Sequence, residues 1–155
     1  MLPAEAIAKL RLWRAVNARI VFTNGVYDLL HRGHVEYLEE AHDLGDRLVV
    51  GMNTDASVRR LKGPSRPIMS QDDRAAVVRA LACVDMVILF EDDTPLRLIE
   101  AVQPDVLVKG ADYATADIVG REVVEAKGGL VTTIALREGL SSSEIVRRIR
   151  EGKGV

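Results

Sequence analysis

Two of the chain's three histidines, His31 and His34, lie three positions apart directly after a short apolar run. If a helix begins near Gly33, its free N–H groups and the positive end of its dipole favour a phosphate group beyond the preceding strand. Histidine N–H donors at that helix start could stabilise charge that grows on phosphate oxygens in a transition state. Polar side chains at a helix start and a metal-binding pair are alternative interpretations of the same residues. The metal pair is the weaker one, because the zinc-peptidase pattern needs two histidines four apart with a glutamate between them.

The elements that must position these residues follow from the apolar pattern. Five short runs rich in β-branched residues predict buried strands at 19–23, 48–52, 86–90, 106–108 and 130–135. Segments of helical period predict helices at 4–16, 35–45, 70–81, 96–102 and 143–150. Because strands and helices alternate, we expect an α/β fold with a doubly wound, five-stranded parallel sheet of the Rossmann type, whose ligands bind beyond the carboxyl ends of the strands. The stretch 61–69, with its glycine and prolines, is a candidate mobile lid.

Composition limits the classes of protein to consider. The 155 residues, of which 48% are apolar and 28% charged, predict one globular domain over 1–155, with residues 1–17 as an N-terminal helix packed on it. A net charge of -2 gives no general attraction for nucleic acid or an anionic membrane, so neither is an expected partner. Cys83 has no partner for an intrachain disulfide, and charges interrupt the N-terminal apolar residues, so we expect a cytoplasmic protein.

The run TNGVYDLLHRGH closely resembles the first motif of the cytidylyltransferase-like nucleotidyltransferases, whose HxGH element is matched by His31, Gly33 and His34. The stretches VGMNTDASVRRLKGPSRPI, EDDTPLRLIEAVQPDVLVKGADY and EGLSSSEIVRRI are similar to the adenylyltransferase domain of bacterial ADP-heptose synthesis, which occurs as the C-terminal half of a bifunctional enzyme or as a free-standing counterpart. The resemblance implies transfer of AMP from ATP to D-glycero-D-manno-heptose 1-phosphate, with release of pyrophosphate. It also implies Mg²⁺ held mainly by phosphate oxygens and water, a homodimer, and a separate sugar kinase upstream.

The resemblance assigns roles to individual residues. The expected catalytic residues are His31, His34 and Lys62. The residues expected to bind ATP are Thr23, Asn24, Gly25, Tyr27, Gly33, Lys109, Gly110, Asp112, Ser141, Ser142 and Ser143. The residues expected to contact the sugar phosphate are Asp28, Asn53 and Asp55. No residue is assigned as a metal ligand.

Several of these residues have a purely structural interpretation beside the functional one. Lys62, placed in the loop after the second strand, could be a solvated charge, and the segment 109–112 could be a strand-to-loop turn. Ser141 followed three positions later by Glu144 forms a capping box, which is compatible with an anion site at the same helix start. Arg74 is left out of the site, because pairing on a helix surface is an equally good account of it. Relatives carry an arginine at the position of Leu136, so a phosphate contact by the neighbouring arginine, at 137, stays open.

Two other functions stay under consideration. One is nucleotidyl transfer to another phosphorylated acceptor, such as glycerol phosphate with CTP, or a flavin or pantetheine precursor with ATP. The other is a nucleotide-binding regulator without catalysis, against which the intact HxGH element argues.

Overall fold

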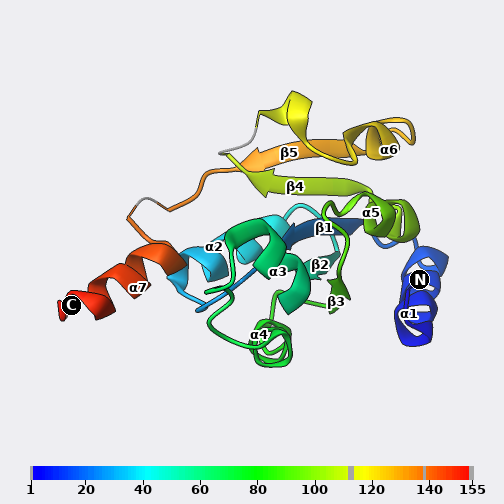
Figure 1. The fold of residues 1–155 in the computed structure, drawn as a ribbon. Coiled ribbons are helices and arrows are strands. Elements are labelled where there is room, and N and C mark those ends of the chain that lie inside the picture. The colour runs from blue at the N-terminus through cyan, green and yellow to red at the C-terminus, as the bar shows by residue number, and fades with distance from the viewer. Residues whose placement is uncertain (1, 112–113, 138, 154–155) are drawn as a thin grey trace.

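The computed structural model describes residues 2–111, 114–137 and 139–153, and it contains one five-stranded sheet with every strand pair parallel. The strand order is β3-β2-β1-β4-β5, which reverses its direction of winding beside β1 (Figure 1). The strands are β1 (Ile20–Gly25), β2 (Arg47–Asn53), β3 (Met86–Phe90), β4 (Val106–Gly110) and β5 (Leu130–Ile134). All five coincide with predicted runs to within two residues at each end, and the predicted doubly wound parallel sheet is confirmed.

Helices cover both faces of the sheet. They are α1 (Ala4–Ala15), α2 (Arg32–His42), α3 (Asp55–Lys62), α4 (Gln71–Arg79), α5 (Leu96–Val102), the 3-10 helix η1 (Thr115–Asp117), α6 (Arg121–Glu125) and α7 (Ser142–Arg150). Successive strand residues point to opposite faces, so Phe22 joins a core with α1, α5 and α6, whereas Val21 joins a second core with α2 and α4. The α1 side chains Ala6, Leu10 and Trp13 are buried in the first of these cores.

Side-chain caps fix where several helices begin. Thr54 accepts a hydrogen bond from the Ser57 N–H at the start of α3, and Ser70 accepts one from the Asp73 N–H at the start of α4. The sequence did not predict α3, and the expected loop at 61–69 is wrong at its first two residues, because α3 continues through Lys62. Lys62 therefore ends a helix and does not lie in a loop.

Within the described residues, no helix is both long enough and apolar enough to cross a membrane. The longest helix, α1, has 12 residues and carries charges along its exposed side.

Candidate active site

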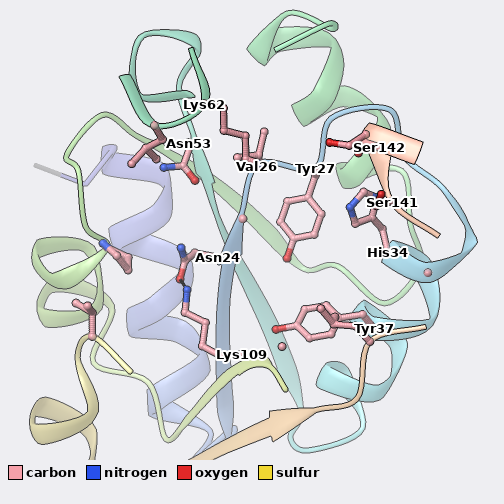
Figure 2. A pocket seen from close by; sticks show the side chains of 18 of the residues that line it. Asn24, Val26, Tyr27, His34, Tyr37, Asn53, Lys62, Lys109, Ser141 and Ser142 are labelled. Atoms are coloured by element: carbon pink, nitrogen blue, oxygen red, sulfur yellow. Dashed lines mark hydrogen bonds between the residues drawn. The ribbon is translucent and has the colours of Figure 1, made fainter. Parts of the chain in front are cut away.

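A cavity of about 610 Å³ opens at the carboxyl ends of β1, β2 and β4, the edge where doubly wound folds bind ligands (Figure 2). Most of the residues predicted for the site line it. They are Asn24, Gly25, Tyr27, His31, Gly33, His34, Asn53, Lys62, Lys109, Gly110, Ser141, Ser142 and Ser143. Three predicted residues, Thr23, Asp28 and Asp55, do not line the cavity, and Asp112 lies outside the described residues.

The two histidines form a stacked pair at the start of α2. Their ring centroids are 3.8 Å apart with an interplanar angle of 21°, and the backbone N–H of His31 donates to Nδ1 of His34 at 3.4 Å. Burial, assisted by the neighbouring His31 and Lys62, lowers the pKa of His34 to about 4, and burial also lowers the pKa of His31. Both imidazoles are therefore neutral at neutral pH. Because Nδ1 of His34 accepts a hydrogen bond, its ring carries its hydrogen on Nε2, which is left as a donor.

Nδ1 of His31 is buried and has no hydrogen-bond partner among the described residues. Gly33 explains how the pair fits, because a Cβ at this position would lie 3.2 Å from both Nδ1 and Cε1 of the His31 ring. The glycine of the HxGH element thus makes room for the His31 ring beside the backbone.

Buried contacts hold α2 in place behind the histidines. Tyr37, Leu38 and Ala41 pack into the core, and the Tyr37 hydroxyl and the hydroxyl of fully buried Thr23 are 2.7 Å apart. Thr23, predicted to line the ATP path, therefore connects β1 to α2 beneath the cavity.

Tyr27 supports His34 from the side. Its ring lies edge-on to the His34 ring at 5.4 Å, and burial raises the pKa of its phenol well above the usual value. The backbone of Tyr27 is left-handed, with φ 51°, and a Cβ on Gly25 would lie 3.0 Å from the Tyr27 ring. The glycine at 25 therefore allows the tyrosine to fold back against the strand end.

Two lysines reach the cavity in different settings. Lys109, near the end of β4, is 9% exposed, and its Nζ donates to Oδ1 of Asn24 on β1 at 2.5 Å. Lys62 is exposed at the end of α3, and its charge contributes to the low pKa of His34. Of the two lysines, one is therefore fixed and the other is exposed to solvent.

The start of α7 supplies the serines. Ser141 accepts from the Glu144 N–H at 3.1 Å, so this half of the predicted capping box is confirmed. The reciprocal half is wrong, because the Glu144 carboxylate pairs with Arg147 at 2.6 Å. The Ser142 hydroxyl donates to the backbone oxygen of Asp28. A second helix start thus faces the same cavity as the start of α2.

The three residues predicted for the sugar phosphate are engaged with other protein groups. Asn53 donates to the Ser57 hydroxyl at 3.0 Å, and Asp55 pairs with Arg74 at 2.7 Å. The Asp28 carboxylate is 4% exposed and accepts three hydrogen bonds from residues 66–69. Burial acts to raise its pKa, but these bonds and the Arg66 charge outweigh it and hold the pKa below its usual value.

Arg74 has a structural role that the sequence analysis did not predict. Its side chain is 1% exposed, so the helix-surface account is wrong. The guanidinium donates to the backbone oxygens of Val26 at 2.5 Å, Asn53 at 2.9 Å and Met69 at 3.2 Å. It therefore joins the ends of β1 and β2 to the segment before α4. Arg74 shares a face of α4 with the buried Ala75 and Val78, which is the signal that points to its burial.

The cavity wall also contains residues that the motifs did not indicate. Phe90 ends β3, and Thr94 and Pro95 follow it, while Ile118 comes from the segment after η1. Phe90 and the residues after it follow the carboxyl end of a strand, as the histidine segment does. Ligands of parallel sheets bind at that edge, so this position alone would have indicated these residues.

The Mg²⁺ that the resemblance implies would have to be held here mainly by phosphate oxygens and water. Across residues 2–111, 114–137 and 139–153, no three His, Cys, Asp or Glu side chains are arranged to hold a metal ion. The lining carboxylates Asp93 and Asp117 are single groups. Because Mg²⁺ keeps several waters and binds through few carboxylates plus substrate phosphates, a protein cage is not required.

Comparisons with known proteins agree with the motif. A family model described as cytidylyltransferase-like matches residues 22–148. The chain is 54% identical over 150 residues to the bifunctional protein HldE of Magnetococcus marinus, covering 97% of this chain and 31% of that protein. It is 57% identical over 131 residues to the bifunctional protein HldE of Citrifermentans bemidjiense, covering 84% and 27%. The chain thus spans under a third of the length of these curated relatives.

A solved structure is also similar. The crystal structure of the lipopolysaccharide core biosynthesis protein from Thermoplasma volcanium has a TM-score of 0.64 and 31% sequence identity to this chain, covering 78% of it and 98% of that chain. The family resemblance read from the HxGH run is therefore confirmed, and the histidine pair lies inside the matched segment.

Proposed function

This chain belongs to the cytidylyltransferase-like family and is a nucleotidyltransferase, and on that premise we propose that it transfers AMP from ATP to D-glycero-D-manno-heptose 1-phosphate. The observation that carries the proposal is the neutral, stacked pair of His31 and His34 at a helix start, inside a cavity that also holds two lysines and a second helix start. The similarity to HldE proteins and to a lipopolysaccharide core biosynthesis protein supports a heptose phosphate as the acceptor.

The reaction is a direct displacement at phosphorus. A phosphate oxygen of heptose 1-phosphate forms a bond to the α-phosphorus of ATP, the bond from that phosphorus to the bridging oxygen of the β-phosphate breaks, and pyrophosphate leaves. Negative charge grows on the oxygens of the α-phosphate and of the leaving group. Donors fixed in advance around those oxygens lower the barrier without a covalent intermediate.

Different residues of the cavity contact different parts of the two substrates. Nε2–H of His34 and the free N–H groups at the start of α2 donate to the phosphates, and the start of α7 at Ser141 receives the same anion from the other side. Lys62 approaches the triphosphate from the end of α3, and Mg²⁺, when bound with the nucleotide, would neutralise part of the phosphate charge. The nucleoside lies toward Lys109 and Gly110, at the end of β4.

The acceptor occupies the part of the cavity beside β2 and β3. Asn53 ends β2 and Phe90 ends β3, and both line the cavity. The amide of Asn53 keeps its oxygen available for a sugar hydroxyl while its nitrogen bonds to Ser57. We keep Asn53 as a sugar contact and assign Asp55 a supporting role through Arg74.

The deciding experiment measures pyrophosphate release with heptose 1-phosphate, using both anomers, with ATP, CTP and GTP in parallel, and with and without Mg²⁺. Release that depends on ATP, on Mg²⁺ and on one anomer supports the proposal. Glycerol 3-phosphate, flavin mononucleotide and phosphopantetheine serve as matched acceptors. Release with one of them and not with the heptose would move the chain to another reaction of the same family.

The supply of the acceptor and the assembly of the protein are part of the proposal. Heptose 1-phosphate must be supplied by a sugar kinase that acts upstream, and we propose that the nucleotidyltransferase acts in the cytoplasm as a homodimer. Light scattering coupled to gel filtration measures the assembly, and a monomer mass at working concentration contradicts it.

A further inference from the structure

The buried carboxylate of Asp28 anchors the segment that follows α3. Its Oδ2 accepts from the Ile68 N–H at 2.8 Å and from Nη1 of Arg66 at 3.2 Å, and its Oδ1 accepts from the Met69 N–H at 2.9 Å. Both oxygens are therefore in use, and the ion pair with Arg66 is shielded from solvent, with side-chain exposures of 16% for Arg66 and 4% for Asp28. A carboxylate in this setting is held by charge-assisted bonds, the stronger class of hydrogen bond.

The same two residues reach the start of α7. The backbone oxygen of Asp28 accepts from the Ser142 hydroxyl, and Nη2 of Arg66 lies 3.4 Å from the Ser143 hydroxyl as a hydrogen-bond donor. Asp28 itself lies three residues before His31, in the segment between β1 and α2. The two residues of the ion pair, through their side chains and the Asp28 backbone, thus join the histidine segment, the chain after Lys62 and the serines of α7.

We propose that Asp28 and Arg66 form a positioning clasp, which sets the Lys62 end of α3 and the α7 serines at the correct distance from the histidine pair. Neither residue lines the cavity, so the clasp acts through its neighbours and contacts no reacting atom. This assigns Asp28 to the architecture of the triphosphate site and removes it from the sugar contacts that the sequence predicts. The effect on kinetics rests on the proposed function, whereas the effect on the backbone of residues 66–69 does not.

The clasp depends on charge as well as on shape. Asp28→Asn keeps the size of the side chain and one acceptor oxygen but loses the ion pair with Arg66. Arg66→Met keeps the apolar stem and removes all guanidinium donors, which leaves the buried carboxylate with two backbone bonds. Arg66→Lys keeps the charge and loses the planar geometry that spans Asp28 and Ser143. Its changes in amide exchange and kinetics should therefore be smaller than those of Arg66→Met, but not absent.

The test compares Asp28→Asn, Arg66→Met, Arg66→Lys and the double variant Asp28→Asn/Arg66→Met with Arg59→Met, a control on the exposed side of α3. Hydrogen–deuterium exchange of the Ile68 and Met69 amides measures directly whether their hydrogen bonds to Asp28 are kept. We expect exchange at both amides to accelerate about tenfold or more in Asp28→Asn and in Arg66→Met, and to stay unchanged in Arg59→Met. The double variant should exchange no faster than the faster single variant, because both substitutions break one unit.

Kinetics separate a positioning role from a sugar contact. We expect KM for ATP to rise about tenfold and kcat to fall in Arg66→Met, with KM for heptose 1-phosphate within about twofold of the unmodified protein. A rise confined to KM for the sugar phosphate in Asp28→Asn, with unchanged exchange at Ile68 and Met69, would overturn the clasp. If no heptose substrate is turned over, the proposed function fails while the exchange rates still decide the clasp. If Asp28→Asn does not fold, Arg66→Met, altered at the more exposed residue, carries the test.

Discussion

The helices α2 and α7 both point their N-termini into the cavity, but the fold holds them in different ways. Three side chains of α2, namely Tyr37, Leu38 and Ala41, are buried in the core. In α7 no residue is buried, and Ile149 on its apolar side is 71% exposed. Figure 1 shows α2 beside the sheet and α7 extending away from the body of the molecule. Apolar packing fixes one wall of the proposed phosphate site, and polar contacts at a few residues fix the other.

The two walls therefore differ in how firmly they hold the side chains that face the cavity. Because the histidines belong to the wall that the core fixes, their donors keep one geometry, which is what stabilisation of a transition state requires. The α7 serines depend on contacts with Asp28, Arg66 and the chain before the helix. Substitutions on the α2 side should therefore give larger effects than substitutions on the α7 side.

The largest effect is expected for His34→Ala. Loss of the Nε2–H donor should lower kcat by about 10² to 10³-fold, as for other single donors to a developing oxyanion, while the fold at neutral pH is kept. Steady-state pyrophosphate release and circular dichroism measure the two quantities.

His42→Ala is the matched control for the histidine. His42 lies near the end of the same helix, 3.9 Å from Asp85, and does not line the cavity. Its removal should leave kcat within about twofold. Equal losses of activity in the two variants would mean that the stacked pair has no special role.

The second effect is a loss of folding stability on the face of the sheet that α2 shares with α4. Arg74→Met leaves three backbone oxygens and the Asp55 carboxylate without their buried donor, which should lower the free energy of unfolding by about 3 kcal/mol. Urea denaturation measures the change.

Arg79→Met, at the exposed last position of the same helix, is the control and should change the free energy of unfolding by less than about 0.5 kcal/mol. A loss in Arg74→Met no larger than in the control would show that Arg74 is dispensable as a link between the strand ends.

The third effect is a dependence of stability on pH that arises at His34. The folded protein holds the pKa of His34 at about 4, below the value of 6.5 that applies when the chain is unfolded. The unfolded chain therefore binds a proton first, so stability is complete above pH 6.5 and is lost as the pH falls toward 4. At pH 5 this loss is about 2 kcal/mol.

Comparison with His34→Asn isolates this contribution, since asparagine does not titrate. Urea denaturation at pH 7 and pH 5 should give a smaller loss of stability in the variant than in the unmodified protein. The Asp28 carboxylate, whose pKa is also lowered, affects stability only below its usual value of 3.8, outside this range. Identical losses in the two proteins would contradict the low pKa of His34.

The sequence was sufficient to predict the sheet and the histidine wall, because each has a local signal. Runs of β-branched residues mark all five strands, and the HxGH element marks its own helix start. The helices α3 and α6 gave no such signal, because they are short and bury few residues, Ser57 and Val58 in one and Val124 in the other. Without a repeated apolar face, helical period cannot be detected.

The supporting contacts of the site could not be predicted, because they join residues far apart in the chain. Asp28 meets the Ile68 N–H across 40 positions, and the Arg74 guanidinium reaches the Val26 oxygen across 48. The family resemblance assigned Asp28 to the sugar phosphate from its position in the motif, which says nothing about the groups that surround it in the fold. Only the fold shows that the carboxylate is already used.

The smallest effect is expected for Arg137→Met, on the chain that leads into α7. Nη1 of Arg137 lies 2.8 Å and 2.9 Å from the two carboxylate oxygens of Glu36 on α2, and Arg137 also lines the cavity. The pair is exposed to solvent, so its removal should scarcely change the melting temperature. This pair is a second link between α2 and the chain that leads into α7, beside the contacts of Asp28 and Arg66 with the α7 serines.

Kinetics decide whether Arg137 also contacts phosphate. If its only partner is Glu36, Arg137→Met should raise KM for ATP by about two- to fivefold and no more than Glu36→Gln does, because Glu36→Gln breaks this exposed pair and also the pair of Glu36 with Arg32. A phosphate contact by Arg137 would give a larger rise in Arg137→Met than in Glu36→Gln, with a steeper dependence on salt in the unmodified protein. A small rise in Arg137→Met, no larger than in Glu36→Gln, would place the phosphate donors of the α7 side in its serines and its backbone N–H groups.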